Sequence, residues 1–260
     1  MSQSGSDMNG KVGFITGGGR GIGFGVAKQL AQRGANLAIN DFDRDRLETA
    51  AKELRAFGNK VSTHLGDVTQ PPAVHDMIAA VEKEHGRIDL LLNNVGLAPP
   101  GVKWTEFLRQ TLDDFRAIVD QNLMTQVIVL KEVLPGMVER GYGKIVCISS
   151  IAGVVGHEGG SAYAAGKAGV NGLVKSLSKE VARYGITINA IVVGNAPSPK
   201  RAPERQKQLD ELSHFGRGGT FEEFGKAIAF YLSDDSSYCT GALVPVDGGV
   251  LAPRTAGEVR

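Results

Sequence analysis

A tyrosine and a lysine four residues apart are the side chains best suited to do chemistry in this chain. The helical i,i+4 spacing of Tyr163 and Lys167 places a phenol and an ammonium group on one face of a helix. A free phenol has a pKa of about 10, and the nearby positive charge favours phenolate, so Tyr163 can exchange a proton near neutral pH. Ser150, at the expected end of a strand, would hydrogen-bond a substrate oxygen. These residues predict a proton-transfer site.

A glycine-rich segment near the N-terminus predicts a binding site for phosphate groups. It runs from Thr16 to Gly23 directly after an apolar run, and an amphipathic helix is expected at residues 22–32. The glycines remove Cβ atoms where a strand must turn sharply into a helix, so backbone N–H groups at the helix N-terminus can approach a pyrophosphate. The residues predicted to contact a dinucleotide in this segment are Gly17, Gly19, Arg20, Gly21, Ile22 and Gly23.

Asp41 indicates which dinucleotide is bound. It ends the second expected strand, 18 residues beyond Gly23, close to the offset of about 20 residues at which an acid meets the adenosine ribose. A carboxylate accepts hydrogen bonds from ribose hydroxyls and repels a 2′-phosphate, so we expect NAD as the cofactor, with NADP less favoured. Two alternatives stay open: Asp41 could only start the turn before the next helix, and Arg20 could reach a 2′-phosphate.

The composition is that of a soluble enzyme of one domain. The 260 residues are 42% hydrophobic and 22% charged, and a net charge of +1 gives no global field for nucleic acid or an anionic membrane. Cys147 and Cys239 lack metal-ligand spacing and the histidines are scattered, so we expect no metal and a reduced, cytoplasmic protein. We expect neither a signal peptide nor a membrane span, and the partner should be a small molecule.

Short β-branched runs alternate with helical patterns along the chain. Because parallel strands need crossover helices, this order predicts a doubly wound α/β fold of the Rossmann type, with a seven-stranded, mostly parallel sheet. The strands are expected at residues 12–16, 36–40, 61–65, 88–92, 144–148, 187–192 and 243–246. We expect a flexible tail at 1–10, one catalytic domain at 11–250, a substrate lid at about 194–219 with a short helix at 203–213, and a C-terminal tail at 251–260.

An ordered set of motifs resembles the short-chain dehydrogenase/reductase family over about residues 11–250. The motifs are Thr16-Gly17-x-x-x-Gly21-Ile22-Gly23, Asp67-Val68, Asn93-Asn94-x-Gly96, Asn122, Ser150, Tyr163-x-x-x-Lys167 and Val246-Asp247-Gly248-Gly249. Two positions depart from the family pattern: Val95 replaces the usual alanine, and Val193 replaces the proline that usually precedes Gly194. In the family, backbone groups near this second position contact the nicotinamide carboxamide, so the resemblance carries over those contacts less directly than the other motifs.

The resemblance implies roles for residues that spacing alone does not assign. Asp67 and Val68 would contact the adenine ring, and Asn94 would support the central strand beside the cofactor. Asn122 would complete a catalytic tetrad with the serine, tyrosine and lysine described above, by positioning a water molecule that links the lysine to solvent. Tyr163 and Lys167 are also expected to contact the cofactor.

These features predict an NAD-dependent short-chain dehydrogenase that transfers hydride between NAD(H) and a secondary alcohol or ketone. One alternative is an NADPH-dependent 3-oxoacyl reductase, which shares the tetrad and against which Asp41 argues. Another is a sensor or scaffold that binds NAD(H) without turnover, against which the intact serine, tyrosine and lysine argue. An enoyl reductase is disfavoured because that branch, by resemblance, has a wider spacing between tyrosine and lysine.

Substrate and assembly are less constrained. The lid carries five cations, which would fit an anionic substrate. The alternative, that they only form a solvated helix face, stays open, and so does a sugar substrate. The cations are Lys200, Arg201, Arg205, Lys207 and Arg217. His157 and Glu158 either line the substrate site or form a surface turn, and Trp104 is interpreted as a packing anchor. The apolar content of the helices expected at 112–138 and 162–184 suits subunit packing in a homotetramer.

Overall fold

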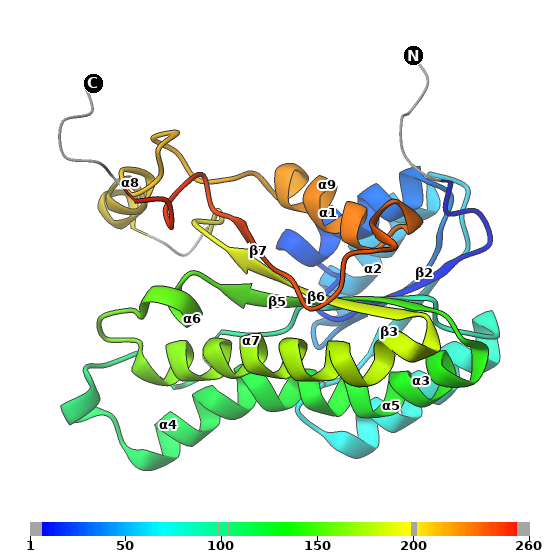
Figure 1. The fold of residues 1–260 in the computed structure, drawn as a ribbon, viewed down its shortest axis with the longest axis horizontal. Helices are drawn as coiled ribbons and strands as arrows, with labels where there is room; N and C mark the ends of the chain where they lie inside the picture. Colours follow the sequence, from blue (N-terminus) through cyan, green and yellow to red (C-terminus); the bar gives the residue numbers. More distant parts are fainter. Residues whose placement is uncertain (1–6, 98, 103, 199–201, 254–260) are drawn as a thin grey trace.

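The computed structural model describes residues 7–97, 99–102, 104–198 and 202–253 and contains one seven-stranded sheet. The strand order is β3-β2-β1-β4-β5-β6-β7, and every neighbouring pair is parallel (Figure 1). The strands are β1 (Val12–Ile15), β2 (Asn36–Asp41), β3 (Val61–Leu65), β4 (Leu90–Asn93), β5 (Gly143–Ser150), β6 (Ile186–Val193) and β7 (Leu243–Val246). The predicted Rossmann-type fold is confirmed, with a sheet that is parallel throughout.

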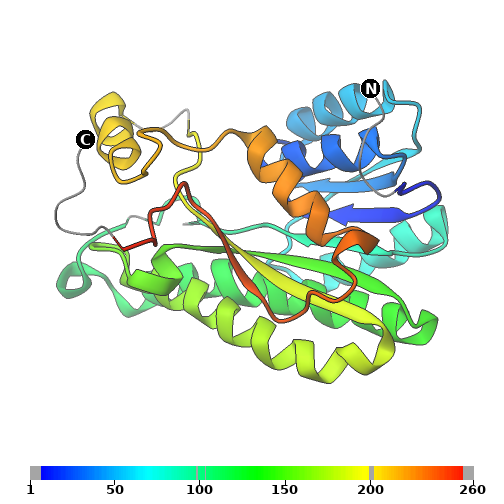
Figure 2. The ribbon, with the colours of Figure 1, turned by 45° about the horizontal axis from the view of Figure 1, so that its top comes forward.

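Helices cover both faces of the sheet (Figures 1 and 2). The helices are α1 (Gly21–Gln32), α2 (Arg44–Arg55), α3 (Pro71–His85), α4 (Leu112–Val119), α5 (Thr125–Arg140), α6 (Ala152–Val155), α7 (Ser161–Val181), α8 (Pro203–Asp210) and α9 (Phe221–Tyr231). Side chains of α1, α2 and α9 form one apolar core, and those of α3, α5 and α7 form the other. Successive strand residues point to opposite faces, so Leu90 and Leu92 enter the first core and Leu91 enters the second.

The helix expected over residues 112–138 is interrupted, which corrects that prediction. A π-helical turn, Asp120–Met124, separates α4 from α5. Within this turn the side-chain amide of Asn122 donates a hydrogen bond of 2.8 Å to the Ile118 carbonyl oxygen. A side chain that bonds to the backbone in this way competes with the regular helical pattern, and such bulges commonly mark functional positions.

The N-terminal boundary also differs from the prediction. Residues 1–6 lie outside the described part of the chain, but Met8 is buried, and its backbone N–H donates to the Arg33 carbonyl oxygen at 2.9 Å. Met8 belongs to the apolar core under α1 and α2. The fold therefore begins before residue 11, because this one apolar side chain in a polar segment finds a place in the core. Among the described residues, no helix has the length and apolar content that crossing a membrane requires.

Two histidines meet at a serine on the edge strand β3. The Ser62 hydroxyl oxygen lies 2.8 Å from His64 Nε2 and 2.7 Å from His85 Nε2. A hydroxyl carries one proton, so it can donate to one ring and must accept from the other. Burial lowers the pKa of both imidazoles below the ordinary histidine value. The fold thus favours the uncharged form of both rings.

We expect the free energy of unfolding to decline as the pH falls below about 6.5, the ordinary pKa of histidine. The unfolded chain then binds protons on His64 and His85 that the folded chain binds less readily, so the stabilisation is complete above this pH and is lost below it. Urea unfolding at pH values of about 7.5, 6.5 and 5.5, followed by circular dichroism, measures the slope. His64→Gln should flatten it, whereas His75→Gln, at an exposed ring bonded to Glu132, should not. An unchanged slope in His64→Gln would contradict this account.

Candidate active site

The turn between β1 and α1 has no room for side chains where phosphate is expected. A Cβ atom on Gly23 would collide with the Gly17 carbonyl oxygen, and Gly17 itself has a φ of 63°, in the left-handed region. Arg20 stands at the N-cap position of α1, its side chain makes no capping hydrogen bond, and the first turn carries no acidic residue. The N-terminal end of α1 thus has no side chain that caps its backbone N–H groups and no acidic residue that offsets the positive end of the helix dipole. The segment therefore fits a pyrophosphate.

The end of β4 holds this turn in place. Asn94 donates its backbone N–H to the Thr16 hydroxyl oxygen at 2.9 Å and its side-chain amide to the Thr16 carbonyl oxygen at 3.0 Å. The two strands β1 and β4 are neighbours in the sheet although 78 residues separate the bonded groups. This is the point where the strand order reverses, at which doubly wound sheets bind their ligands. Thr16 was part of the sequence motif, but its role as the partner of Asn94 needed the structure.

Asp41 lies at the end of β2 directly against the glycine turn. Its carboxylate is buried, and a Cβ atom on Gly19 would lie only 2.6 Å from Asp41 Oδ2. The other oxygen, Oδ1, accepts the backbone N–H of Asp43 at 3.1 Å, so Asp41 starts the turn before α2 as well as facing the predicted cofactor position. Arg46 lies 3.7 Å from the same carboxylate oxygen. The sequence interpretation did not include Arg46, because its local pattern does not show that the first turn of α2 lies close to Asp41 at the end of β2.

The residues expected around the adenine lie at the end of β3. Asp67 is exposed, and its carboxylate accepts the Thr69 backbone N–H at 2.9 Å. The Val68 side chain is buried in the core, so its predicted contact with adenine would come from its backbone. Asn40, absent from the predicted site, donates its side-chain amide to the carbonyl oxygens of His64 and Gly66 at 3.0 and 2.9 Å and thereby fixes this strand end. Arg20 is exposed, and Ile22 is half-buried against the core.

The structure brings Ser150, Tyr163 and Lys167 together at the end of β5. Lys167 is buried, its ammonium donates to the Ile148 carbonyl oxygen at 2.9 Å, and its Nζ lies 5.8 Å from the centre of the Tyr163 ring. Burial lowers the pKa of Lys167 to about 8. Burial also raises the pKa of Tyr163, and the hydrogen bond with Ser150 acts in the opposite direction.

The raised pKa of Tyr163 differs from the lowered value expected from the i,i+4 spacing. Desolvation disfavours the charged form of both groups, and for Tyr163 it outweighs the hydrogen bond with Ser150 that favours phenolate. The protein alone therefore holds a protonated phenol beside an ammonium group that gives up its proton more readily than usual. A positively charged nicotinamide ring would supply the further stabilisation that phenolate requires.

Asn122 joins the π-helical turn to the loop after β4. It is fully buried; its amide donates to the Leu97 carbonyl oxygen at 2.8 Å, and its oxygen accepts the Leu97 backbone N–H at 2.9 Å. Leu97 has a φ of 110°, which leucine rarely adopts and which the two bonds hold in place. A Cβ atom on Gly96 would lie 2.7 Å from Lys167 Nζ and 2.8 Å from Asn122 Oδ1. The lysine and the asparagine thus approach each other across a glycine.

Trp104 lies against Tyr163, the candidate catalytic tyrosine. The sequence interpretation of Trp104 as a packing anchor did not predict this contact. The centres of the Trp104 and Tyr163 rings are 4.8 Å apart with an angle of 36° between their planes. The His157 ring meets the same indole edge-on, with the ring centres 5.6 Å apart and 87° between the planes. Of the two interpretations of His157, the structure therefore favours a place in the lining of the substrate site over a plain surface turn. Glu158 is exposed. No spacing rule links a loop tryptophan to a helical tyrosine 59 residues later, so only the fold could reveal this contact.

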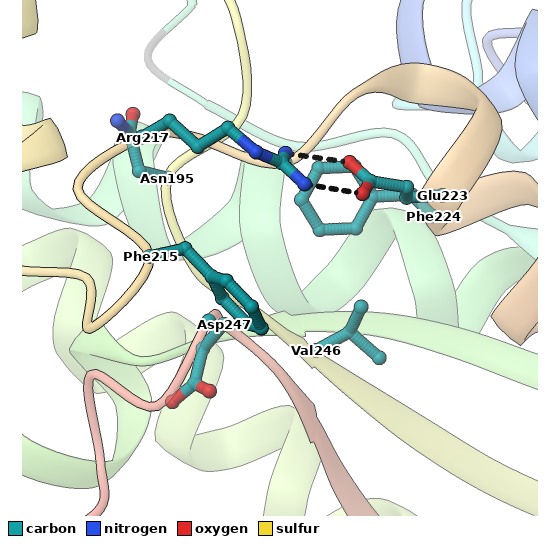
Figure 3. Close-up of a pocket in the computed structure, with 9 residues that line it drawn as sticks. Asn195, Phe215, Arg217, Glu223, Phe224, Val246 and Asp247 are labelled. Atoms are coloured by element: carbon teal, nitrogen blue, oxygen red, sulfur yellow. Dashed lines mark hydrogen bonds and ion pairs between the residues drawn. The ribbon is translucent and has the colours of Figure 1, made fainter.

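The lid borders a cavity of about 280 Å³ beside the end of β7 (Figure 3). Arg217 makes a bidentate ion pair with Glu223, at 2.7 and 2.9 Å, and Glu223 also caps α9 through Thr220. The charge of Arg217 is therefore already matched by a carboxylate, so an anionic substrate would depend on the other lid cations. Two of the other lid cations, Lys200 and Arg201, lie outside the described residues. The lid helix α8 ends at Asp210, three residues earlier than expected.

Comparison with known proteins agrees with this architecture. The sequence model of a family described as "Enoyl-(Acyl carrier protein) reductase" matches residues 17–251. A curated relative, 3-oxoacyl-[acyl-carrier-protein] reductase FabG of Thermotoga maritima, is 34% identical over 248 residues, covering 94% of this chain and 99% of the relative. These matches show that the chain belongs to the short-chain dehydrogenase/reductase family, as the motifs predicted, and is an oxidoreductase of that family.

Two solved structures share the fold over their full length. The crystal structure of levodione reductase has a TM-score of 0.89 and 33% identity, covering 95% of this chain and 100% of that one. The crystal structure of NAD⁺-bound xylitol dehydrogenase has a TM-score of 0.86 and 31% identity, covering 93% and 99%. A protein named as a reductase and an NAD⁺-bound protein named as a dehydrogenase thus share this fold.

We expect Gly96→Ala to lower turnover more than it lowers stability. The new methyl group would meet Lys167 Nζ and Asn122 Oδ1 at less than 3.0 Å, and both are side-chain ends that can shift without moving the backbone. The displaced ammonium would leave the position in which it supports Tyr163, so kcat should fall at least ~10-fold while the melting temperature changes by only a few degrees, roughly the effect of 1 kcal/mol.

Gly172→Ala is the matched control for this substitution. Gly172 lies on α7, the helix that carries Tyr163 and Lys167, but a Cβ atom there meets nothing within 4 Å. Its kcat should equal that of the unmodified protein. Steady-state kinetics with any accepted alcohol and differential scanning calorimetry provide both measurements. Equal kcat values for Gly96→Ala and Gly172→Ala would show that the glycine does not control the lysine and asparagine positions.

Proposed function

We propose that this protein is an NAD(H)-dependent dehydrogenase that interconverts a small secondary alcohol and the matching ketone. The observation that carries the proposal is the meeting of Ser150, Tyr163 and Lys167 at the end of β5, one strand away from β4 and its link to the glycine turn. A bound nicotinamide would accept or donate the hydride. The residues of the chain would handle the proton and hold the substrate oxygen.

The roles of these residues follow from their positions. Ser150, buried at the strand end, would hydrogen-bond the substrate oxygen and orient the reacting carbon. Tyr163 would take the hydroxyl proton during oxidation and return it during reduction. Lys167, with its pKa lowered to about 8, would stabilise phenolate while charged and exchange its own proton near neutral pH. Asn122, which faces Lys167 across Gly96, would hold the water molecule through which that proton leaves.

Asp41 supports NAD as the preferred cofactor. Its buried carboxylate lies against Gly19, where the ribose of a dinucleotide on the glycine turn would come, and a 2′-phosphate there would face like charge. NADPH-dependent 3-oxoacyl reduction is the second candidate, favoured by the 34% identity to the reductase from Thermotoga maritima. Arg20 and Arg46 are the cations that could offset Asp41 in that case. The intact proton-transfer site argues against a sensor or scaffold that binds NAD(H) without turnover.

Assembly and substrate charge stay proposals of their own. β7 is an edge strand whose Leu243, Val244 and Val246 are only half-buried, which suits cover by another copy in a homotetramer. An anionic substrate would depend on lid cations other than Arg217, since Arg217 is paired with Glu223. The cytoplasmic location likewise stays a prediction from cysteine content.

Activity with a panel of secondary alcohols, followed by absorbance of the reduced cofactor, tests the proposed function. The unmodified protein should oxidise at least one of them, and Tyr163→Phe should lower kcat at least ~10²-fold because general acid–base transfer is lost. The dissociation constant for NAD should stay within about threefold, since a phenylalanine ring keeps the shape of the site. Turnover by Tyr163→Phe close to that of the unmodified protein would contradict the assignment.

Cofactor choice is tested by Asp41→Ala. The unmodified protein should have a higher kcat/KM with NAD than with NADP, and removing the carboxylate should narrow this ratio by about tenfold, the effect of roughly 1.4 kcal/mol. Asp45→Ala is the control, because that acid lies in the first turn of α2, where the helix N-terminus favours negative charge, and is not the ribose candidate. Equal use of both cofactors by the unmodified protein would mean that Arg20 and Arg46 outweigh Asp41.

A further inference from the structure

Three rings from three separate segments meet at the candidate proton-transfer site. Trp104 comes from the loop between β4 and α4, His157 from the loop between α6 and α7, and Tyr163 from α7 itself. The indole lies tilted against the phenol ring, with the ring centres 4.8 Å apart and 36° between the planes, and the imidazole meets the indole edge-on at 5.6 Å. Contacts of this kind on two sides hold the indole in a definite orientation.

Trp104 is nevertheless not a core residue. It is 38% exposed, so part of the indole surface remains open beside the phenol that it covers. Leu97, whose backbone Asn122 holds at a φ of 110°, is 59% exposed in the same β4–α4 connection. A strained backbone persists only where its surroundings determine it, and here two hydrogen bonds with Asn122 hold the Leu97 backbone, one residue after the glycine that faces Lys167. The connection therefore presents apolar surface next to the reacting groups.

The position of the phenol dictates what a substrate must touch. An oxygen that exchanges a proton with Tyr163 lies within about 3 Å of the phenol oxygen, so the carbon skeleton attached to it comes beside the stacked indole. Hydroxyl groups pressed against an indole face would lose water without gaining hydrogen-bond partners. An apolar skeleton would instead gain contact area, and a ring gains most because it is rigid and presents a flat side.

We propose that Trp104 is a substrate-recognition residue that selects alcohols and ketones whose reacting carbon belongs to an apolar ring. This inference rests on the proposed dehydrogenase function and narrows its substrate class. Tyr163 supplies the proton, Trp104 supplies the surface along which the ring lies, and His157 holds the indole in place.

Selectivity among alcohols with equal carbon number is the first test. Cyclopentanol, pentan-2-ol and xylitol are compared in steady-state oxidation with NAD⁺. The unmodified protein should favour cyclopentanol over pentan-2-ol in kcat/KM by about tenfold, as expected for an aromatic contact. Trp104→Leu should abolish that preference by lowering kcat/KM for cyclopentanol alone, and Trp104→Phe should keep most of it.

Phe57→Leu is the matched control for loss of an aromatic ring. Phe57 is 40% exposed, close to the 38% of Trp104, but follows α2 near the start of β3, at the opposite edge of the sheet from the strand ends. It should leave the selectivity unchanged. An unmodified protein that prefers xylitol, or a Trp104→Leu variant that retains the full preference for cyclopentanol, would overturn the proposal.

A binding measurement separates this inference from the proposed function. Trp104 is the single tryptophan of the chain, so intrinsic fluorescence reports on this indole alone. In Tyr163→Phe with NAD⁺, whose kcat should be at least ~10²-fold lower, cyclopentanol should change the tryptophan emission saturably and at lower concentration than pentan-2-ol. If cyclopentanol changes the tryptophan emission saturably but the unmodified protein does not oxidise it, the proposed dehydrogenase function is refuted and the recognition role of Trp104 is retained. Turnover of cyclopentanol with no fluorescence response would keep the dehydrogenase and refute the recognition role.

Discussion

The buried ammonium group of Lys167 is the constraint on which the rest of the site depends. A lysine excluded from water loses its hydration, and the carbonyl oxygen of Ile148, at 2.9 Å, replaces part of it. Beneath it Cys147 offers no negative charge, because burial raises the pKa of that thiol to about 12. The proton on Lys167 is therefore held weakly, with a pKa lowered to about 8. A group in this state is suited to exchanging protons, and the surrounding structure serves to keep it there.

Much of the local backbone can be understood from this requirement. A Cβ atom on Gly153 would lie 2.7 Å from the Lys167 carbonyl carbon, so a glycine lets α6 pack against α7 at this level. Gly96 leaves room for the ammonium on the other side. Asn122 lies in the π-helical turn that interrupts a long helix, and its side chain makes two hydrogen bonds to the backbone of the strained Leu97. The regular α-helix is thus interrupted at Asn122, the polar residue that faces Lys167 across Gly96. Such π-helical turns tend to occur at functional sites.

The cofactor side of the molecule depends on a different principle, the shared edge of parallel strands. Asp41 ends β2, Asn94 follows β4 and Ser150 ends β5, so three residues far apart in the chain lie along one edge of the sheet. The glycine turn after β1 lies between the first two, and Gly19 and Gly17 approach Asp41 and Asn94 respectively. This arrangement joins the candidate phosphate-binding segment to the candidate proton-transfer site within one sheet, as the proposed hydride transfer would require.

The sequence by itself determined the sheet and the glycine turn, because these depend on local patterns, and it proposed the tetrad from those patterns and the family resemblance. Buried parallel strands are apolar runs, and i,i+4 spacing already places Tyr163 and Lys167 on one helix face. Tertiary structure alone decided the rest. It raised the pKa of Tyr163 through burial, paired Arg217 with Glu223, and placed Trp104 against the phenol ring of that candidate catalytic tyrosine. Burial and loop contacts arise between segments distant in the chain, and no residue spacing encodes them.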